Sequence, residues 1–201
     1  MAASVRQPSL FDTGPRVLAQ DAQGGIVYTP ALIDGATAQA WFERLRDGVA
    51  WQSYSRPMYD RIVEVPRLVA SYRLSSPELP EVLARAAAVV RAHTGVPFNA
   101  VGLNHYRDGQ DSVAPHNDKL RILVPPHPIA LLSVGSTRRM IIRAKQPPRR
   151  AMPIDLEPGS LLVMSYDSQK HYDHGVPKTR EEVGPRISLA FRVRPDAEPM
   201  P

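Results

Sequence analysis

The sequence predicts a mainly β (α+β) fold, a sandwich or jelly roll with two helices laid on one face. From residue 98 onward, short segments alternate between apolar and polar side chains, and Gly or Pro turns separate them. Two earlier segments repeat their apolar residues at helical spacing. The 21 prolines in 201 residues, about twice the usual share, disfavour a helical bundle.

The N-terminal elements precede this β region. Residues 1–20 mix Pro, Gly, Gln and Asp without periodicity and are predicted to form a tail. Residues 25–28 are typical of a short strand. Residues 36–49 and 80–94 are predicted to form amphipathic helices whose apolar stripes pack on a sheet.

The segment 51–68 suits a surface that binds nucleic acid. It interleaves aromatic side chains with arginines, namely Trp51, Tyr54, Arg56, Tyr59, Arg61 and Arg67. Aromatic rings stack on bases, and guanidinium groups neutralise phosphates. A loop whose aromatic side chains cover the edge of the core has the same composition, so both interpretations stay open.

Eight short strands are predicted after residue 98. They span 101–106, 112–116, 129–134, 138–143, 153–156, 160–166, 173–176 and 186–193. We expect a single domain over residues 21–194 and a short tail at 195–201. Within the domain, residues 21–98 form a helical and lid extension, and residues 99–194 form the core.

Composition limits the possible functions. The net charge of +5 and the pI of about 9.7 favour a polyanionic partner such as nucleic acid, although 21 arginines against 4 lysines is a skew that nucleotide composition alone could produce. The absence of cysteine excludes disulfides, zinc-thiolate sites and thiol catalysis. No apolar leader or membrane-length apolar run occurs, so we expect a cytoplasmic protein with no membrane partner.

His116 and Asp118 are the first candidate site residues. Residues two apart on a strand point to the same face, so an imidazole and a carboxylate can meet on one ion. A second histidine, His174, would complete the 2-His-1-carboxylate set of non-haem Fe(II) oxygenases. A surface histidine and an aspartate in a turn would give the same short pattern.

The last predicted strand alternates between two kinds of side chain. Ile187, Leu189 and Phe191 lie on one face, and Arg186 and Arg192 lie on the other. If the arginine-bearing face is outside, the guanidinium groups are solvated. If it lines the interior, the buried arginines need anions, and a small dicarboxylate would suit them.

From about residue 50 to 194 the chain resembles the AlkB family of Fe(II)/2-oxoglutarate-dependent nucleic-acid demethylases. The order and spacing of several segments carry this resemblance, namely 65–68, 98–99, 104–109, 116–118, 128–135, 159–164, His174 and 186–192. The resemblance implies a double-stranded β-helix (jelly roll) core with N-terminal helices and a nucleotide-binding lid.

The resemblance also implies the ligands of the iron. His116, Asp118 and His174 would hold Fe(II), and His174 is preferred to His171 because the family's ligand precedes a turn made of a small residue and Pro.

The cosubstrate 2-oxoglutarate has implied partners as well. Arg186 and Tyr106 would bind its distal carboxylate, and Arg192 and Asn104 would lie near the end that chelates iron. An Arg–carboxylate pair can be bidentate and charge-assisted, which explains Arg at that place rather than Lys.

The implied reaction consumes 2-oxoglutarate and O₂ and oxidatively demethylates N-alkylated bases of the 1-methyladenine or 3-methylcytosine type, which releases succinate and formaldehyde. The base must leave the stack to be reached. Tyr59 and His116 would flank it, and Arg67 and Arg61 would contact phosphate or form part of the lid. We expect a monomer acting on single- or double-stranded nucleic acid.

One position departs from the family pattern. Members that act on nucleic acid commonly carry an acidic residue two positions after the metal-binding Asp, and here that position is Leu120, followed by Arg121. The alternatives are therefore the same iron chemistry on a protein or small molecule, and a non-catalytic binding module that uses residues 51–68.

Overall fold

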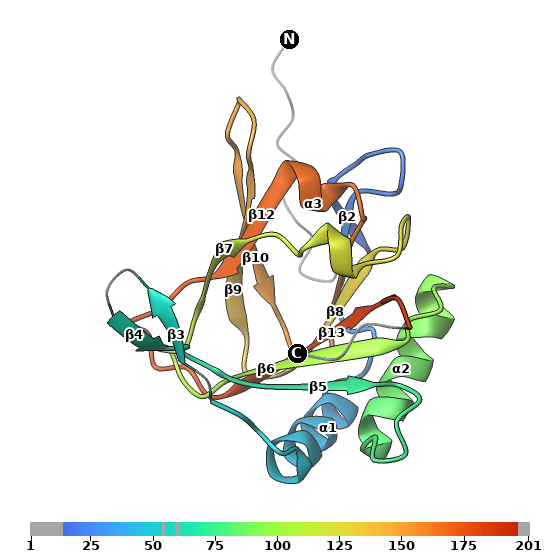
Figure 1. Ribbon diagram of the computed structural model, residues 1–201, viewed down its shortest axis with the longest axis vertical. Coiled ribbons are helices and arrows are strands. Elements are labelled where there is room, and N and C mark those ends of the chain that lie inside the picture. Colours follow the sequence, from blue (N-terminus) through green and yellow to red (C-terminus); the bar gives the residue numbers. More distant parts are fainter. Residues whose placement is uncertain (1–13, 54, 59–60, 197–201) are drawn as a thin grey trace.

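Two antiparallel β-sheets face each other, and two helices cover the outer face of the larger sheet (Figure 1). The computed structural model describes residues 14–53, 55–58 and 61–196. Its strands are β1 (Arg16–Ala19), β2 (Ile26–Thr29), β3 (Ser55–Met58), β4 (Arg61–Glu64), β5 (Leu68–Arg73), β6 (Ala100–Tyr106), β7 (Val113–His116), β8 (Ile129–Gly135), β9 (Arg138–Ala144), β10 (Ala151–Leu156), β11 (Leu161–Met164), β12 (Tyr172–Val176) and β13 (Arg186–Arg192). Its helices are α1 (Gly35–Gly48), α2 (Glu81–Thr94), α3 (Ser168–His171) and the 3₁₀ turn η1 (Leu120–Ile122).

The topology is that of a jelly roll, as predicted. The larger sheet has the strand order β1-β2-β11-β8-β13-β6-β5, and the smaller sheet has the order β10-β9-β12-β7. Strands β3 and β4 form a separate two-stranded sheet, which lies at the left in Figure 1. None of the described helices is long and apolar enough to cross a membrane.

Local sequence signals explain where the two long helices begin and end. Asp34 caps α1, because its carboxylate accepts a hydrogen bond from the backbone N–H of Thr37 at 2.8 Å. Helix α2 ends at Gly95, which has the left-handed φ of 70° that glycine adopts without steric cost. Each helix buries one apolar stripe, centred on residues such as Leu45 and Leu83, against the larger sheet.

Strand β13 divides its side chains between two cores. Ile187, Leu189 and Phe191 belong to the core under α1 and α2. Ala190 belongs to the second core, which lies between the two sheets, and Arg186 on the same face is 1% exposed. The arginine-bearing face of this strand therefore lines the interior, which resolves the alternative that the sequence left open.

The structure confirms both predicted helices and the predicted strands after residue 98, with ends that differ by a few residues. The predicted tail is wrong for residues 16–19, which form β1 and pair with β2. A four-residue strand at a sheet edge shows too little periodicity to be recognised. Strands β3, β4 and β5 were also not predicted, because prolines and charged residues interrupt the alternation between residues 51 and 73.

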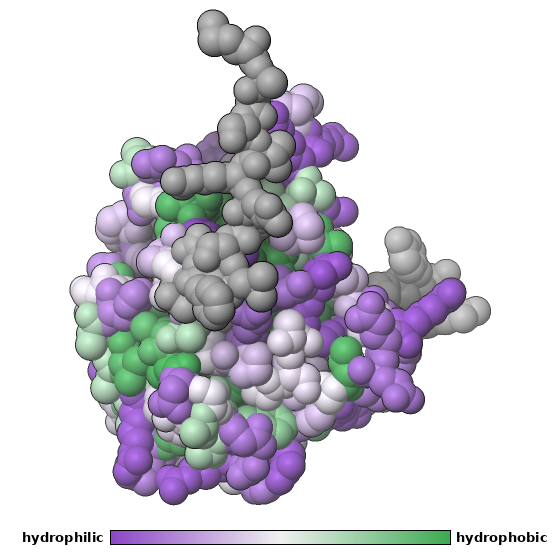
Figure 2. Space-filling model, turned by 180° about the vertical axis from the view of Figure 1, so that it is seen from behind, coloured by the Kyte–Doolittle hydropathy of each residue, from purple (hydrophilic) through white to green (hydrophobic). Residues whose placement is uncertain are grey.

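One face of the molecule mixes hydrophilic and hydrophobic residues (Figure 2). Figure 2 shows hydrophilic residues along the lower rim of the molecule, the part where α1 lies in Figure 1. Among the large hydrophobic side chains that the structure describes, only Val17 is exposed, at 62%.

Gly135 at the end of β8 provides a test of this packing. Its φ is +84°, and a Cβ there would lie 2.5 Å from the Pro185 carbonyl oxygen and 2.7 Å from Cδ2 of Phe42. We expect Gly135→Ala to lower the free energy of unfolding by about 2 kcal/mol, measured by urea denaturation. The matched control is Gly35→Ala at the start of α1, where no atom lies within 4 Å of an added Cβ. Equal unfolding midpoints for the two variants would contradict this account.

Candidate active site

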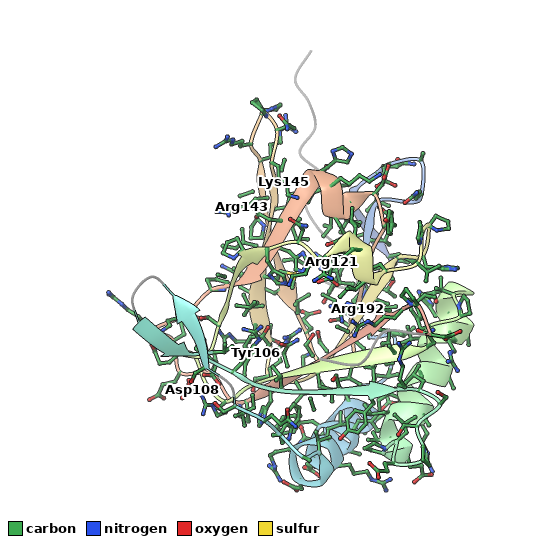
Figure 3. The ribbon with its side chains drawn as sticks, viewed as in Figure 1. Tyr106, Asp108, Arg121, Arg143, Lys145 and Arg192 are labelled. Atoms are coloured by element: carbon green, nitrogen blue, oxygen red, sulfur yellow. The ribbon has the colours of Figure 1, made fainter. Side chains whose placement is uncertain are left out.

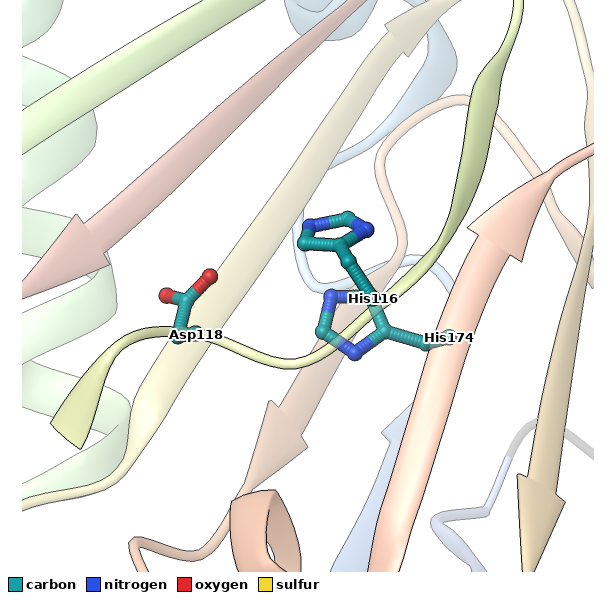
Figure 4. Close-up of side chains that lie close together, drawn as sticks. All are labelled: His116, Asp118 and His174. Carbon is teal, nitrogen blue, oxygen red and sulfur yellow. The ribbon is translucent and has the colours of Figure 1, made fainter. Parts of the chain in front are cut away.

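Strand pairing brings two histidines together. His174 in β12 lies directly opposite His116 at the end of β7, and their ring centroids are 4.5 Å apart. Asp118 follows two residues after the end of β7, in the turn that leads to η1. The ligand atoms of these three residues all lie within 4.8 Å of one another (Figure 4). The predicted trio therefore converges, although Asp118 lies in a turn rather than on the strand.

The protonation of the trio suits a cation. Nδ1 of His116 lies 3.0 Å from the Ala114 carbonyl oxygen, which can only accept, so Nδ1 donates this hydrogen bond and Nε2 is the nitrogen left to bind a metal. Burial, and then the neighbouring His116, lower the pKa of His174 to about 4, so this imidazole is neutral at pH 7. Burial alone would raise the pKa of Asp118, but the charge and the hydrogen bond of the Arg192 guanidinium outweigh it, so the pKa lies below its ordinary value and the carboxylate is ionised at pH 7.

The turn that carries Asp118 is held by two residues that the sequence did not point out. Gln169 in α3 is 1% exposed, and its Oε1 accepts a hydrogen bond from the backbone N–H of Asp118 at 3.0 Å. Lys145 Nζ donates to Oδ1 of Asn117 at 2.8 Å and to the Gln169 carbonyl oxygen at 2.9 Å (Figure 3). These hydrogen bonds join segments far apart in the chain, so no local sequence pattern predicts them.

The trio fits Fe(II). Two imidazole nitrogens and one carboxylate oxygen, all within 4.8 Å of one another, form the facial set of non-haem iron oxygenases. His171, the rival third ligand, is exposed on α3 and lies outside this cluster of described residues.

A buried cation lies deeper between the sheets. Arg186 is 1% exposed and donates from Nη2 to Oγ of Ser133 at 2.9 Å, whereas its Nε and Nη1 have no hydrogen-bond partner among the described residues. Burial lowers the pKa of Arg186 to about 10, so the guanidinium remains charged at pH 7. A buried charge with two unused donors calls for an anion.

Tyr106 adds a further donor at this point. It lies opposite Arg186 in the β6–β13 register, is 3% exposed, and has its ring centroid 5.4 Å from the Arg186 Cζ. Burial raises the pKa of Tyr106 above its ordinary value despite the nearby guanidinium groups, so the phenol keeps its proton. The residues present thus fit one carboxylate of 2-oxoglutarate, as the sequence suggested.

One cavity of about 600 Å³ joins the remaining predicted site residues. Arg67, Asn104 and Arg192 line it together with His116 and Asp118. Arg192 Nε donates to Oδ2 of Asp118 at 2.5 Å, so this guanidinium lies beside the metal ligand. Arg67 Nε donates to Oδ1 of Asn104 at 2.7 Å. The cosubstrate roles of Asn104 and Arg192 stay predictions.

The remaining substrate candidates lie where the structure does not describe them. Tyr59 falls outside the described residues, and the side chain of Arg61 in β4 is likewise not described. The predicted contacts of these two residues with a base or with phosphate therefore remain predictions.

Known proteins resemble this chain in sequence. Residues 69–192 match the 2OG-Fe(II) oxygenase superfamily. Human DNA oxidative demethylase ALKBH2 is 37% identical over 118 residues, which cover 55% of this chain and 45% of that protein. Human alpha-ketoglutarate-dependent dioxygenase alkB homolog 3 is 32% identical over 192 residues, which cover 86% of this chain and 67% of that protein. The chain thus spans less than half of ALKBH2 and about two thirds of alkB homolog 3.

Solved structures resemble it in fold. OsALKBH1 superposes with a TM-score of 0.59 at 16% identity, covering 86% of this chain and 100% of that one. A prolyl-4-hydroxylase from Pseudomonas putida superposes with a TM-score of 0.55 at 14% identity, covering 85% and 94%. Such distant likeness concerns the fold alone, and it agrees with the predicted jelly roll.

Removing the support of the metal-binding turn should weaken metal binding. We expect Gln169→Leu to lower the affinity of the metal-free protein for Mn(II) about tenfold, because the Asp118 backbone loses its acceptor. Isothermal titration calorimetry measures the affinity, and circular dichroism checks the fold. The control is Gln39→Leu, an exposed glutamine on α1 that pairs with Glu43. An unchanged affinity in Gln169→Leu would contradict the positioning role.

Removing the buried cation should weaken cosubstrate binding. We expect Arg186→Met to lower the affinity of the Mn(II)-loaded protein for 2-oxoglutarate about 10- to 100-fold, because charge-assisted hydrogen bonds are lost. Calorimetry under anaerobic conditions checks this. Arg139→Met, which removes a surface ion pair with Asp155, should leave the affinity as it was. If both variants bound the cosubstrate equally well, Arg186 would not be its anchor.

Proposed function

The chain belongs to the AlkB family of the 2OG-Fe(II) oxygenase superfamily, and we propose that it oxidatively demethylates N-alkylated bases in DNA or RNA. The products are the repaired base, formaldehyde and succinate. The protein acts as a monomer in this proposal.

One observation carries the proposal. A cluster that fits Fe(II) lies on the wall of a cavity of about 600 Å³, and a buried guanidinium with two unused donors lies between the same two sheets. The cluster supplies ligands for a metal, and the guanidinium supplies a cationic partner for a carboxylate of the cosubstrate. When bound, Fe(II) with 2-oxoglutarate and O₂ supplies an oxidant strong enough to attack a C–H bond.

The residues of the chain divide the remaining work. His116, Asp118 and His174 hold the metal, and Arg192 orients the Asp118 carboxylate through the 2.5 Å contact. Arg186, supported by the Ser133 hydroxyl, holds the distal carboxylate of the cosubstrate. The apolar second core surrounds that end and excludes water from it.

Charge supports a nucleic-acid substrate. The net charge of +5 suits a polyanion, and the relatives that match include a protein named as a DNA oxidative demethylase. Arg121 is exposed directly after the metal-binding turn, and Arg149 and Arg150 are exposed at the turn between β9 and β10. Exposed cations on the surface suit contacts with phosphates, which position the strand.

A second candidate keeps the iron chemistry and changes the substrate. Leu120, at the position where the nucleic-acid members commonly carry an acid, packs its side chain against the second core. The same site could therefore oxidise a protein or a small molecule.

The test is product formation with a single-stranded oligonucleotide that carries one 3-methylcytosine. We expect formaldehyde and succinate in equal amounts, with both falling at least about 100-fold in His116→Ala, because a direct metal ligand is lost. His93→Ala, an exposed histidine at the end of α2, serves as the matched control and should keep full activity. Succinate without formaldehyde would favour the second candidate, and the absence of both products would contradict the proposed function.

A further inference from the structure

The turn between β1 and β2 meets the N-terminal end of α3, the short helix that supports the metal-binding turn (Figure 1). The Ser165 N–H donates to the Gly25 carbonyl oxygen at 2.8 Å, and the Asp167 N–H donates to Oε1 of Gln23 at 2.9 Å. The second of these contacts joins residues 144 positions apart in the chain. A segment near the N-terminus therefore lies directly beside a support of the metal site.

Asp21 binds the groups of this turn together. Its Oδ1 accepts from the backbone N–H groups of Gln23 and Gly25, both at 2.8 Å, and its Oδ2 accepts from the Ser165 hydroxyl at 2.6 Å. Burial would raise the pKa of Asp21, but these three hydrogen bonds outweigh it, so the pKa lies below its ordinary value. The carboxylate is thus ionised at pH 7 and can only accept hydrogen bonds.

Two buried serines continue from Asp21 toward the metal site. A serine hydroxyl has one proton to donate. Ser165 donates its proton to Asp21, so its oxygen is left to accept from the Ser168 N–H at 3.0 Å. Ser168 donates its own proton to the Ser165 carbonyl oxygen at 2.7 Å, so its oxygen accepts from Nε2 of Gln169 at 3.2 Å. Each hydrogen bond therefore has a direction that its neighbour determines.

The last of these hydrogen bonds reaches Asp118. Because Nε2 of Gln169 is directed at Ser168, Oε1 of the same amide faces the Asp118 backbone N–H at 3.0 Å. The reverse orientation of the amide would place two N–H donors against each other. A continuous series of hydrogen bonds thus joins the N-terminal turn to the metal-binding turn. We call this series the relay; it consists of Asp21, Ser165, Ser168 and Gln169.

We propose that Asp21 is a positioning residue for the metal site, acting through the relay on the turn that carries Asp118. The proposal rests on the proposed function for its metal centre, and the substrate plays no part in it. The relay holds the turn in place before a metal binds, so less conformational freedom is lost on binding. Without the Asp21 carboxylate, the Ser165 hydroxyl can turn, and the later hydrogen bonds lose their fixed directions.

The experiment measures Mn(II) binding to the metal-free protein by isothermal titration calorimetry. We expect Asp21→Ala to lower the affinity about fivefold, less than Gln169→Leu does, because Asp21 acts only through the other members of the relay. Hydrogen exchange of residues 117–123 in the metal-free protein should become about fivefold faster in the same variant. The matched control is Asp34→Ala, which removes the two hydrogen bonds that cap α1 and should change neither quantity.

The double variant Asp21→Ala/Gln169→Leu distinguishes a positioning role from a general loss of stability. If Asp21 acts through Gln169, the double variant binds Mn(II) as tightly as Gln169→Leu alone, because the relay is already broken. Two effects that multiply would overturn the proposal, since Asp21 would then act by another route. An unchanged Mn(II) affinity in Asp21→Ala would overturn it as well.

Should Asp21→Ala fail to fold, Ser165→Ala decides. It breaks the relay and leaves the hydrogen bonds of Asp21 with Gln23 and Gly25 in place. A lowered Mn(II) affinity in this variant supports the proposal, whereas an unchanged one overturns it and leaves the proposed function intact. Absence of Mn(II) binding by the wild-type protein would overturn both.

Discussion

The antiparallel pairing of β12 with β7 is the interaction on which the site depends. It places His174 opposite His116 although the two lie far apart in the chain, and the turn after β7 then presents Asp118 to the same point. Backbone hydrogen bonds of a sheet tolerate little displacement, so the pairing of the two strands fixes the position of one imidazole relative to the other. The carboxylate, which lies in a turn, needs the separate support of Gln169 and Lys145.

Strand β13 shows how one segment serves both stability and chemistry. Its apolar face completes the core under the helices, and that burial fixes the strand in the centre of the larger sheet. Because side chains alternate between the two faces of a strand, the opposite face holds Arg186 in the interior. Burying a guanidinium without a charged partner costs free energy. The apolar burial in one core thus stabilises a strand that keeps a buried guanidinium with two unused donors in the other core.

The sequence allowed the strands after residue 98 and both long helices to be predicted, because their periods of two and of about 3.6 residues are long enough to recognise. It also identified His116, Asp118 and His174, since the spacing within the first pair is local. Gln169 escaped prediction because its contact with the metal-binding turn crosses 51 residues and involves a backbone N–H. The hydrogen bond between Arg67 and Asn104 also escaped prediction, because a contact between side chains of distant segments produces no pattern in the sequence of either segment.

Lys145 separates two parts of the β9–β10 hairpin. Its side chain and backbone bind Asn117 and α3, and it lies directly beyond the last hydrogen bond of the hairpin stem, from the Ala144 N–H to the Arg150 carbonyl oxygen. The five residues 146–150 beyond it are exposed. The tip of this hairpin can therefore change in length and composition while the metal-binding turn stays as it is. A change at this tip would alter the surface beside the metal-binding turn and leave the contacts that hold Asp118 in place.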